Sequence, residues 1–138
     1  MIQASPEVML ILMDQSGGID GRFYRMLQLM FTENFLEANP DFVARLKERY
    51  LRAPISDTNS LRQFIACAKS DTYERLSEIK NPTLVATGTD DRLIPPQNSQ
   101  MLAQRIPGAK LVDYKGSGHG FMSQSRDIFI KDLFNFFR

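Results

Sequence analysis

The spacing of apolar and polar positions differs between the two parts of the chain. Over residues 20–79, apolar residues recur at steps of three and four, which is the period of an amphipathic helix. Later, 83–87 and 109–114 are short and mainly apolar runs bounded by Gly or Pro, as expected of strands. Helical stretches begin after them, at Pro95 and at Arg126. Strand, helix, strand and helix with short connections predict a right-handed parallel crossover.

Start and stop signals divide the helical part into shorter elements. The apolar stripe from Arg22 to Leu36 predicts one helix. Asn39-Pro40-Asp41 supplies an N-cap, a proline at the first helical position and an acid in the first turn, so it predicts a second helix. We expect Pro54 to end that helix and Asp57-Thr58 to begin a third. Asp71-Thr-Tyr-Glu74 resembles a capping box that leads into a further short helix.

Near the start of the chain, Val8 to Met13 is a continuous apolar run, followed by the polar loop 14–18. Such a run predicts a strand that is buried on both faces. A helix stays open as the alternative, because Met and Leu are good helix formers. With the two later runs, this segment leads us to expect an α/β fold with about three parallel strands.

Composition narrows the functional classes. The chain has 138 residues, 43% hydrophobic and 24% charged, which fits one structural domain of a soluble protein. Its formal charge is +1, so we expect neither nucleic acid nor a membrane as a partner. Cys67, the single cysteine, can form no internal disulfide, which fits a reducing compartment and predicts a cytoplasmic location. The apolar run near the start is too short for a signal peptide or a membrane span.

Two residues with acid and base chemistry follow the two later strands. Asp91 lies in the turn after the first strand, and His119, the only histidine, lies in a Gly-Ser-Gly-His-Gly loop after the second. Because the carboxyl ends of parallel strands meet at one edge of a sheet, we expect the two side chains to lie together. The carboxylate would orient the imidazole, and the imidazole would act as a general base. Glycines on both sides of His119 allow positive φ values and close approach of another group.

Each of these residues also has a purely structural interpretation. Asp91 and its neighbour Asp90 could simply cap the turn, as aspartate often does. His119, taken alone, could be a solvated or structural histidine. The occurrence of an acid and a base at one expected sheet edge favours the catalytic interpretation over these two.

Several motifs of this region have a counterpart in a known family. They are Ile79-Lys-Asn-Pro-Thr-Leu-Val, Gly88-x-x-Asp91-x-x-x-Pro95, Leu102-x-x-x-Ile106-Pro-x-Ala109 and Gly116-x-Gly-His119-Gly. Residues 76–138, which contain them, resemble the C-terminal part of an α/β-hydrolase. The resemblance implies that Asp91 is the acid of a catalytic triad, after the seventh strand of that fold, and that His119 is the triad base, after the eighth.

The resemblance also implies an organisation for the whole chain, a partial α/β-hydrolase fold with a helical cap insertion. Residues 1–19 would be the first core strand, the sixth of the family, with its loop. The segment 20–79 would be the helical cap that many members insert after that strand. Residues 80–138 would form the C-terminal core. This earlier part of the match is based on the order of elements more than on individual residues.

One member of the triad is missing from the sequence. Members of the family carry a nucleophilic serine in a Gly-x-Ser-x-Gly motif before the cap, and this chain contains no such motif. Ser16 and Ser117 are superficial substitutes, but neither has glycines two positions before and two positions after it. We therefore expect a fragment that retains the base and the acid of the family and lacks its nucleophile.

The resemblance implies an ester or lactone hydrolase with a small-molecule substrate and with no metal or organic cofactor. A non-catalytic scaffold or dimerisation module of the same fold is the alternative, since a fold does not guarantee chemistry. A cofactor-free oxidoreductase of this fold is a third possibility. If Val8–Met13 is a strand, its free edge invites pairing with a second copy, so we also expect a homodimer through that edge.

Overall fold

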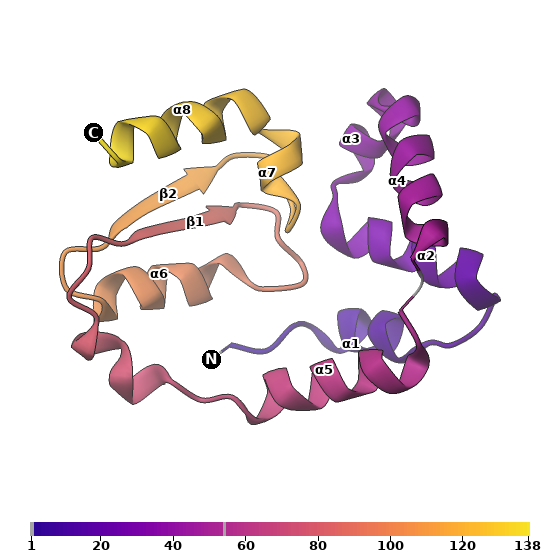
Figure 1. Cartoon of the computed structure of the whole chain (residues 1–138), viewed down its shortest axis with the longest axis horizontal. Helices are drawn as coiled ribbons and strands as arrows, with labels where there is room; N and C mark the ends of the chain where they lie inside the picture. Colours follow the sequence, from indigo (N-terminus) through magenta and orange to yellow (C-terminus); the bar gives the residue numbers. More distant parts are fainter. Residues whose placement is uncertain (1, 54) are drawn as a thin grey trace.

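A computed structural model of the chain describes residues 2–53 and 55–138. Its elements, in chain order, are α1 (Pro6–Met13), α2 (Gly18–Met30), α3 (Glu33–Ala38), α4 (Pro40–Arg52), α5 (Asp57–Lys69), the 3₁₀ helix η1 (Tyr73–Glu78), β1 (Leu84–Gly88), α6 (Pro96–Arg105), β2 (Lys110–Tyr114), α7 (Phe121–Gln124) and α8 (Arg126–Phe136). In Figure 1, the sheet and the helices beside it, α6 and α8, lie on the left of the molecule. Helices α2, α3 and α4 form a separate group on the right. Segments containing α1 and α5 run between these two groups.

The sheet of the described residues consists of β1 and β2, which pair in parallel from Leu84 with Lys110 to Gly88 with Tyr114. The crossover helix α6 packs on both strands, and α8 lies on the opposite side of the sheet (Figure 1). Both strands therefore form where the sequence predicts them. Both arrows in Figure 1 point toward α2 and α3, so the carboxyl ends of the strands face the helical group.

Aromatic packing attaches β2 to the last two helices. The ring of Tyr114 stacks on Phe121 with centroids 5.0 Å apart, and Phe129 meets both rings edge-on. The Tyr114 hydroxyl donates a hydrogen bond to Asp132 at 3.1 Å. Burial, reinforced by the nearby Asp132 carboxylate, raises the pKa of Tyr114 to about 12. The phenol therefore remains a neutral donor throughout the pH range in which proteins are stable.

The predicted strand at Val8–Met13 is wrong, because this segment is part of helix α1. Ser5 is the N-cap, and its side chain accepts a hydrogen bond from the Val8 amide at 3.3 Å, while Pro6 occupies the first turn. These capping signals override the apolar run. Only Val8 is buried, and Leu10 is 71% exposed. The described residues therefore contain two parallel strands instead of about three, and the expected dimer edge at Val8–Met13 does not exist as a strand.

The helical interpretation of residues 20–79 is confirmed, with differences in detail. The single helix expected from Arg22 to Leu36 is two helices, α2 and α3, because Phe31 and Thr32 have extended backbone conformations. The next helix begins at Pro40 as predicted and ends at Arg52, while Pro54, the predicted stop, is outside the described residues. The segment after Asp71 forms the 3₁₀ helix η1, but the predicted capping box is wrong: Thr72 is the N-cap without a side-chain capping hydrogen bond, and the Asp71 carboxylate accepts from the Tyr73 amide at 3.0 Å. The three-part domain division of the chain stays a prediction.

The helical group has its own apolar core. Phe23, Leu27 and Phe31 of the α2 region are buried together, and Phe23 is only 1% exposed. Partly buried residues that pack against them come from α2, α3 and α4: Met30, Phe35, Leu36, Phe42, Val43, Leu46 and Tyr50. The amphipathic stripes thus bury one face of each helix, as their spacing predicts.

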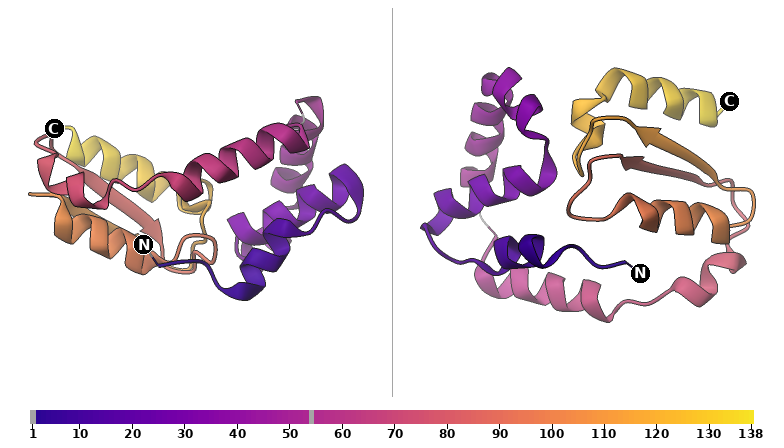
Figure 2. Two further views of the ribbon diagram at one scale, coloured as in Figure 1. Left: turned by 90° about the horizontal axis from the view of Figure 1, so that it is seen from below. Right: turned by 180° about the vertical axis from the view of Figure 1, so that it is seen from behind.

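Other apolar surfaces have no partner among the described residues. On α5, Leu61, Phe64 and Ile65 form a stripe at helical spacing, and each of these side chains is more than 40% exposed. Figure 2 shows α5 running along the outside of the molecule. The edge of β1 that faces away from β2 also pairs with no strand of the described chain. Exposed apolar area of this kind marks a surface suited to contact with more protein.

The first residues are attached to the sheet side of the molecule by a side-chain amide. Asn98 of α6 is buried, and it accepts a hydrogen bond from the Ile2 amide at 2.7 Å and donates one to the Ile2 carbonyl at 2.8 Å. Asn98→Leu removes both hydrogen bonds at similar volume, so we expect the free energy of unfolding to fall by about 1–3 kcal/mol. Urea denaturation measures this value. The matched change Asn135→Leu, at an exposed position of α8, should have little effect.

Candidate active site

Asp91 is held in a defined position by its own turn. It lies three residues after the last residue of β1 and is 7% exposed. One carboxylate oxygen, Oδ1, accepts hydrogen bonds from the amides of Leu93 at 2.9 Å and Ile94 at 2.8 Å. The turn capping that the sequence suggested as an alternative role therefore does occur. It occupies Oδ1 and leaves Oδ2 for another partner.

That partner is His119, as the sequence predicts. The Asp91 Oδ2 atom lies 2.9 Å from Nδ1 of His119, 28 residues further along the chain. Because an ionised carboxylate can only accept, Nδ1 donates, and the other ring nitrogen, Nε2, carries the lone pair. Nε2 has no hydrogen-bond partner among residues 2–53 and 55–138, and the side chain is 36% exposed. The arrangement presents an oriented base that is open to an incoming group.

A close backbone approach joins the two loops that carry this pair. The Asp90 amide donates to the Ser117 carbonyl at 2.9 Å. At Gly88, an added Cβ atom would lie 2.2 Å from the carbonyl oxygen of Ser117 and 2.3 Å from that of Gly118. Only glycine fits there, because real Cβ atoms do not come so near to backbone. Gly88 thus allows the His119 loop to lie directly over the end of β1.

The glycines beside His119 matter because they have no side chain, and not because they adopt unusual dihedral angles. Gly120 has a φ of −81°, and neither it nor Gly118 is among the glycines with positive φ, so that part of the expectation is wrong. Close approach is confirmed, because a Cβ at Gly120 would lie 2.2 Å from the Phe31 ring. Gly116, two residues before Gly118, has the positive φ of 70° that turns the loop.

The helical group contacts this loop at two points that the sequence interpretation did not identify. The Gly120 amide donates to the Met30 carbonyl at 2.6 Å, and Gln124 donates to the Thr32 hydroxyl at 2.8 Å. Residues of these types are common and follow no periodic pattern. The one usable signal was Gly120, since a glycine in a loop can mark a place where another group packs closely.

Neither serine considered as a nucleophile contacts the imidazole. The Ser117 hydroxyl is buried and pairs with the hydroxyl of Ser125 at 2.9 Å. Ser16 lies before α2, where its hydroxyl donates to Asp14 at 3.0 Å. Both hydroxyls therefore have partners of their own, and no hydrogen bond connects either of them to His119.

The charge on His119 depends on its partner. The hydrogen bond that His119 donates to Asp91 is the main cause that raises the pKa of His119 above its usual 6.5, and partial burial opposes the shift. Protonation of His119 therefore stabilises the folded state below pH about 6.5, and this contribution is lost as the pH rises through the higher folded pKa.

We expect Asp91→Asn to lower the pKa of His119, since the substitution removes the charge that stabilises the imidazolium. A titration of the imidazole Cε1–H resonance by NMR measures this directly, because the chain has a single histidine. An unchanged pKa would show that Asp91 is not its partner in solution.

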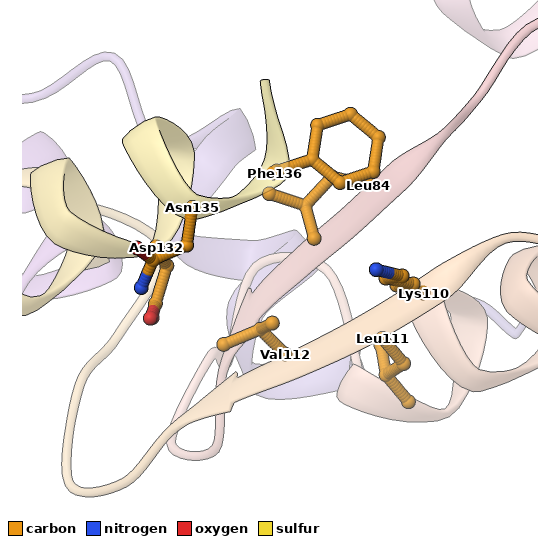
Figure 3. Close-up of a pocket in the computed structure, with 7 residues that line it drawn as sticks. All are labelled: Leu84, Lys110, Leu111, Val112, Asp132, Asn135 and Phe136. Carbon is orange, nitrogen blue, oxygen red and sulfur yellow. The ribbon is translucent and has the colours of Figure 1, made fainter. Parts of the chain in front are cut away.

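Two hollows lie elsewhere on the sheet. One, of about 470 Å³, opens between β2 and α8 (Figure 3). Its lining residues are Leu84, Lys110, Leu111, Val112, Asp132, Asn135 and Phe136. The second, of about 510 Å³, lies between β1 and the aromatic side of α8. Asp91 and His119 line neither of these two hollows.

The described part of the chain contains neither a cluster of metal ligands nor a membrane-spanning helix. Among these residues, no group of three or more His, Cys, Asp or Glu side chains is placed to hold a metal ion. No described helix is both long and apolar enough to cross a membrane.

Comparison with known proteins identifies relatives of part of the chain. A RutD protein of Azorhizobium caulinodans, whose name proposes carbamate hydrolysis for it, is 36% identical over 78 residues, which are 56% of this chain and 28% of that protein. A bifunctional esterase/perhydrolase of Acinetobacter calcoaceticus is 32% identical over 75 residues, or 54% of this chain and 27% of that protein. The match therefore spans little more than a quarter of the length of these relatives.

Solved structures extend the match to almost all of the chain. An enol-lactonase from Burkholderia xenovorans LB400 has a TM-score of 0.79 at 23% identity, with 96% of this chain and 48% of that chain covered. A thermophilic esterase from Thermogutta terrifontis has a TM-score of 0.75 at 19% identity, with 99% and 52% covered. These similarities show the fold. The chain spans about half of each.

The family described as the alpha/beta hydrolase fold matches residues 21–124, which is more than half of the chain. This range includes most of the helical group, both strands, Asp91 and His119. The sequence match and the shared fold agree with the expectation from the motifs. The chain belongs to the α/β-hydrolase family.

Proposed function

We propose that this chain supplies the base and the orienting acid of a serine-type hydrolase that cleaves an ester or lactone. The observation that carries the proposal is the 2.9 Å contact between Asp91 Oδ2 and His119 Nδ1 at the carboxyl ends of two parallel strands. Esterase and lactonase are among the names of the similar proteins. The asymmetric environment of the imidazole, paired at Nδ1 and open at Nε2, is the one that a general base requires.

In this mechanism, Nε2 of His119 takes the proton of a serine hydroxyl as that oxygen attacks the substrate carbonyl. Asp91 keeps the tautomer with the proton on Nδ1 and stabilises the imidazolium that forms. The imidazolium then gives its proton to the leaving alkoxide, and an acyl-serine remains. Water, deprotonated by the same Nε2, then attacks the acyl group; the bond to the serine oxygen breaks, the imidazolium returns the proton to that oxygen, and the acid is released.

The serine would come from protein outside this sequence. No Gly-x-Ser-x-Gly motif occurs in the chain, and its match covers about half of the similar structures. Further strands beside β1 would pair with its open edge, and further helices would cover the apolar stripe on α5. In this proposal, the unpartnered surfaces of the described chain would receive the rest of the hydrolase fold.

A binding role without catalysis is the second candidate, and the same exposed apolar surfaces favour it. In that case two copies would bury each other's exposed apolar surfaces in a homodimer, and neither copy would act on a substrate. Because Val8–Met13 is a helix, such a dimer would use the β1 edge or the stripe on α5. Sedimentation at micromolar concentration tests this candidate, and a monomer would argue against it.

An ester-hydrolysis assay tests the catalytic proposal. The chain alone is compared with a joined protein, in which the N-terminal part of a family member, with its Gly-x-Ser-x-Gly motif, precedes this chain. We expect turnover of a p-nitrophenyl ester only by the joined protein, and a return to the background rate in its His119→Ala variant. Turnover that is independent of His119, or none in a folded joined protein, would contradict the proposal.

A further inference from the structure

We propose that Gln124 is a positioning residue that ties the loop carrying His119 to the α2–α3 junction, so that the helical group helps to set the place of the imidazole. Its importance for catalysis rests on the proposed function. The connection itself is a property of this chain and can be tested without any nucleophile.

The Gln124 side chain bridges two segments that lie far apart in the sequence. Its Oε1 atom accepts a hydrogen bond from the amide of Gly118 at 2.8 Å, directly before His119. Its Nε2 atom donates to the hydroxyl of Thr32 at 2.8 Å, 92 residues earlier in the chain. Figure 1 shows α7, which ends at Gln124, next to the α2–α3 region. One amide group thus joins the His119 loop to the helical group.

A second, separate contact holds the other side of His119. The Gly120 amide donates to the Met30 carbonyl at 2.6 Å, and the Phe31 ring packs against Gly120. Met30 is the last residue of α2, so its carbonyl belongs to the helix end that has no intrahelical donor. Both backbone neighbours of His119 are therefore fixed, one through Gln124 and one directly, by the same short segment 30–32.

Burial makes these partners necessary. Gly118 and Gly120 are both buried, and a buried amide without an acceptor is costly. At Thr32, the side chain makes no capping bond to α3 although it occupies the N-cap position, so its hydroxyl is free to accept from Gln124. The break between α2 and α3, which the apolar spacing did not predict, is the feature that brings Met30 and Thr32 to the loop.

The two hydrogen bonds define which substitutions are informative. Gln124→Met keeps the length of the side chain and removes both its acceptor and its donor. Thr32→Val keeps the shape of the threonine and removes only the link to the helical group. Gln100→Met is a matched control, because Gln100 is exposed on α6, away from the loop.

The experiment is NMR of the chain itself, with two measurements on each variant. Amide hydrogen exchange is followed at Gly118 and Gly120, and the single imidazole resonance is titrated with pH. In Gln124→Met we expect exchange at Gly118 to accelerate at least tenfold and the pKa of His119 to fall toward 6.5, as the loop leaves Asp91. Thr32→Val should shift both in the same direction by less, and Gln100→Met should shift neither.

Unchanged exchange and an unchanged pKa in Gln124→Met would overturn the proposal, as would an equal change in Gln100→Met. If Gln124→Met does not fold, Thr32→Val decides, since faster exchange at Gly118 supports the bridge and unchanged exchange overturns it. The NMR measurements test the Gln124 bridge independently of the ester assay, which tests hydrolysis. Changes in the NMR measurements with no turnover in the joined protein would preserve the bridge and refute hydrolysis, and turnover with no such changes would do the reverse.

Discussion

Asp91→Asn is expected to lower ester hydrolysis by the joined protein about 10⁴-fold, mainly through kcat. The amide group can donate a hydrogen bond to Nδ1 of His119, 2.9 Å away, where the carboxylate only accepts. It therefore favours the tautomer with the proton on Nε2, which cannot take a proton from a serine. The charge that stabilises the imidazolium is lost as well.

Steady-state kinetics on a p-nitrophenyl ester measure this loss, and the neighbouring residue provides a matched control. Asp90 is exposed, and within the described part of the chain its carboxylate accepts a hydrogen bond only from the adjacent Thr89 hydroxyl, at 3.0 Å. Asp90→Asn should leave kcat within a factor of about three, because a surface substitution of this kind is nearly neutral. Equal losses in the two variants would contradict the role assigned to Asp91.

Phe23→Ala is expected to lower the free energy of unfolding of the chain by about 3–5 kcal/mol. Phe23 is 1% exposed, and its ring lies 5.4 Å from that of Tyr50, so it joins α2 to α4 in the core of the helical group. Truncation removes the apolar transfer free energy and leaves a cavity that its neighbours fill only in part. Because domains are only marginally stable, this loss can unfold the helical group.

Urea denaturation followed by circular dichroism measures the effect of Phe23→Ala. Phe134→Ala is the matched control, since Phe134 is 65% exposed on α8. It should change the free energy of unfolding by no more than about 0.5 kcal/mol. A small effect at Phe23, or equal effects at both positions, would mean that the helical group does not pack around Phe23 as described.

Local signals predicted most of the elements because the capping residues and the apolar periods agree. The second helix begins at Pro40, the last at Arg126, and both strands form within one residue of their expected starts. At these places propensity, turn chemistry and burial all favour the same conformation. Elements of this kind can be predicted from a single sequence.

The errors arose where tertiary contacts or caps decided between two conformations. A short apolar run such as Val8–Met13 has no period of its own, so its helical cap at Ser5 was the deciding signal. The stripe from Arg22 to Leu36 continues through Phe31 and Thr32, yet these residues leave the helix where they contact the His119 loop. Periodicity alone contains no information about such a contact.

The sequence predicted one part of the candidate site, the Asp91–His119 pair, but not the contacts that hold it in place. The pairing of Asp91 with His119 followed from strand order, because parallel strands bring their carboxyl ends together. The bridge through Gln124 did not, since glutamine and threonine occur throughout the chain and their pairing depends on the path of the α2–α3 segment. The proposed serine nucleophile has no counterpart to predict, because the chain contains no Gly-x-Ser-x-Gly motif.

Labelling with a fluorophosphonate tests most directly whether Asp91 and His119 serve a serine. The reagent modifies a serine hydroxyl only where a neighbouring base activates it, and peptide mass spectrometry identifies the modified residue. We predict no labelling of this chain alone, labelling of the Gly-x-Ser-x-Gly serine in the joined protein, and loss of that labelling in His119→Ala. Labelling of the chain alone, or of the joined protein without His119, would contradict this account.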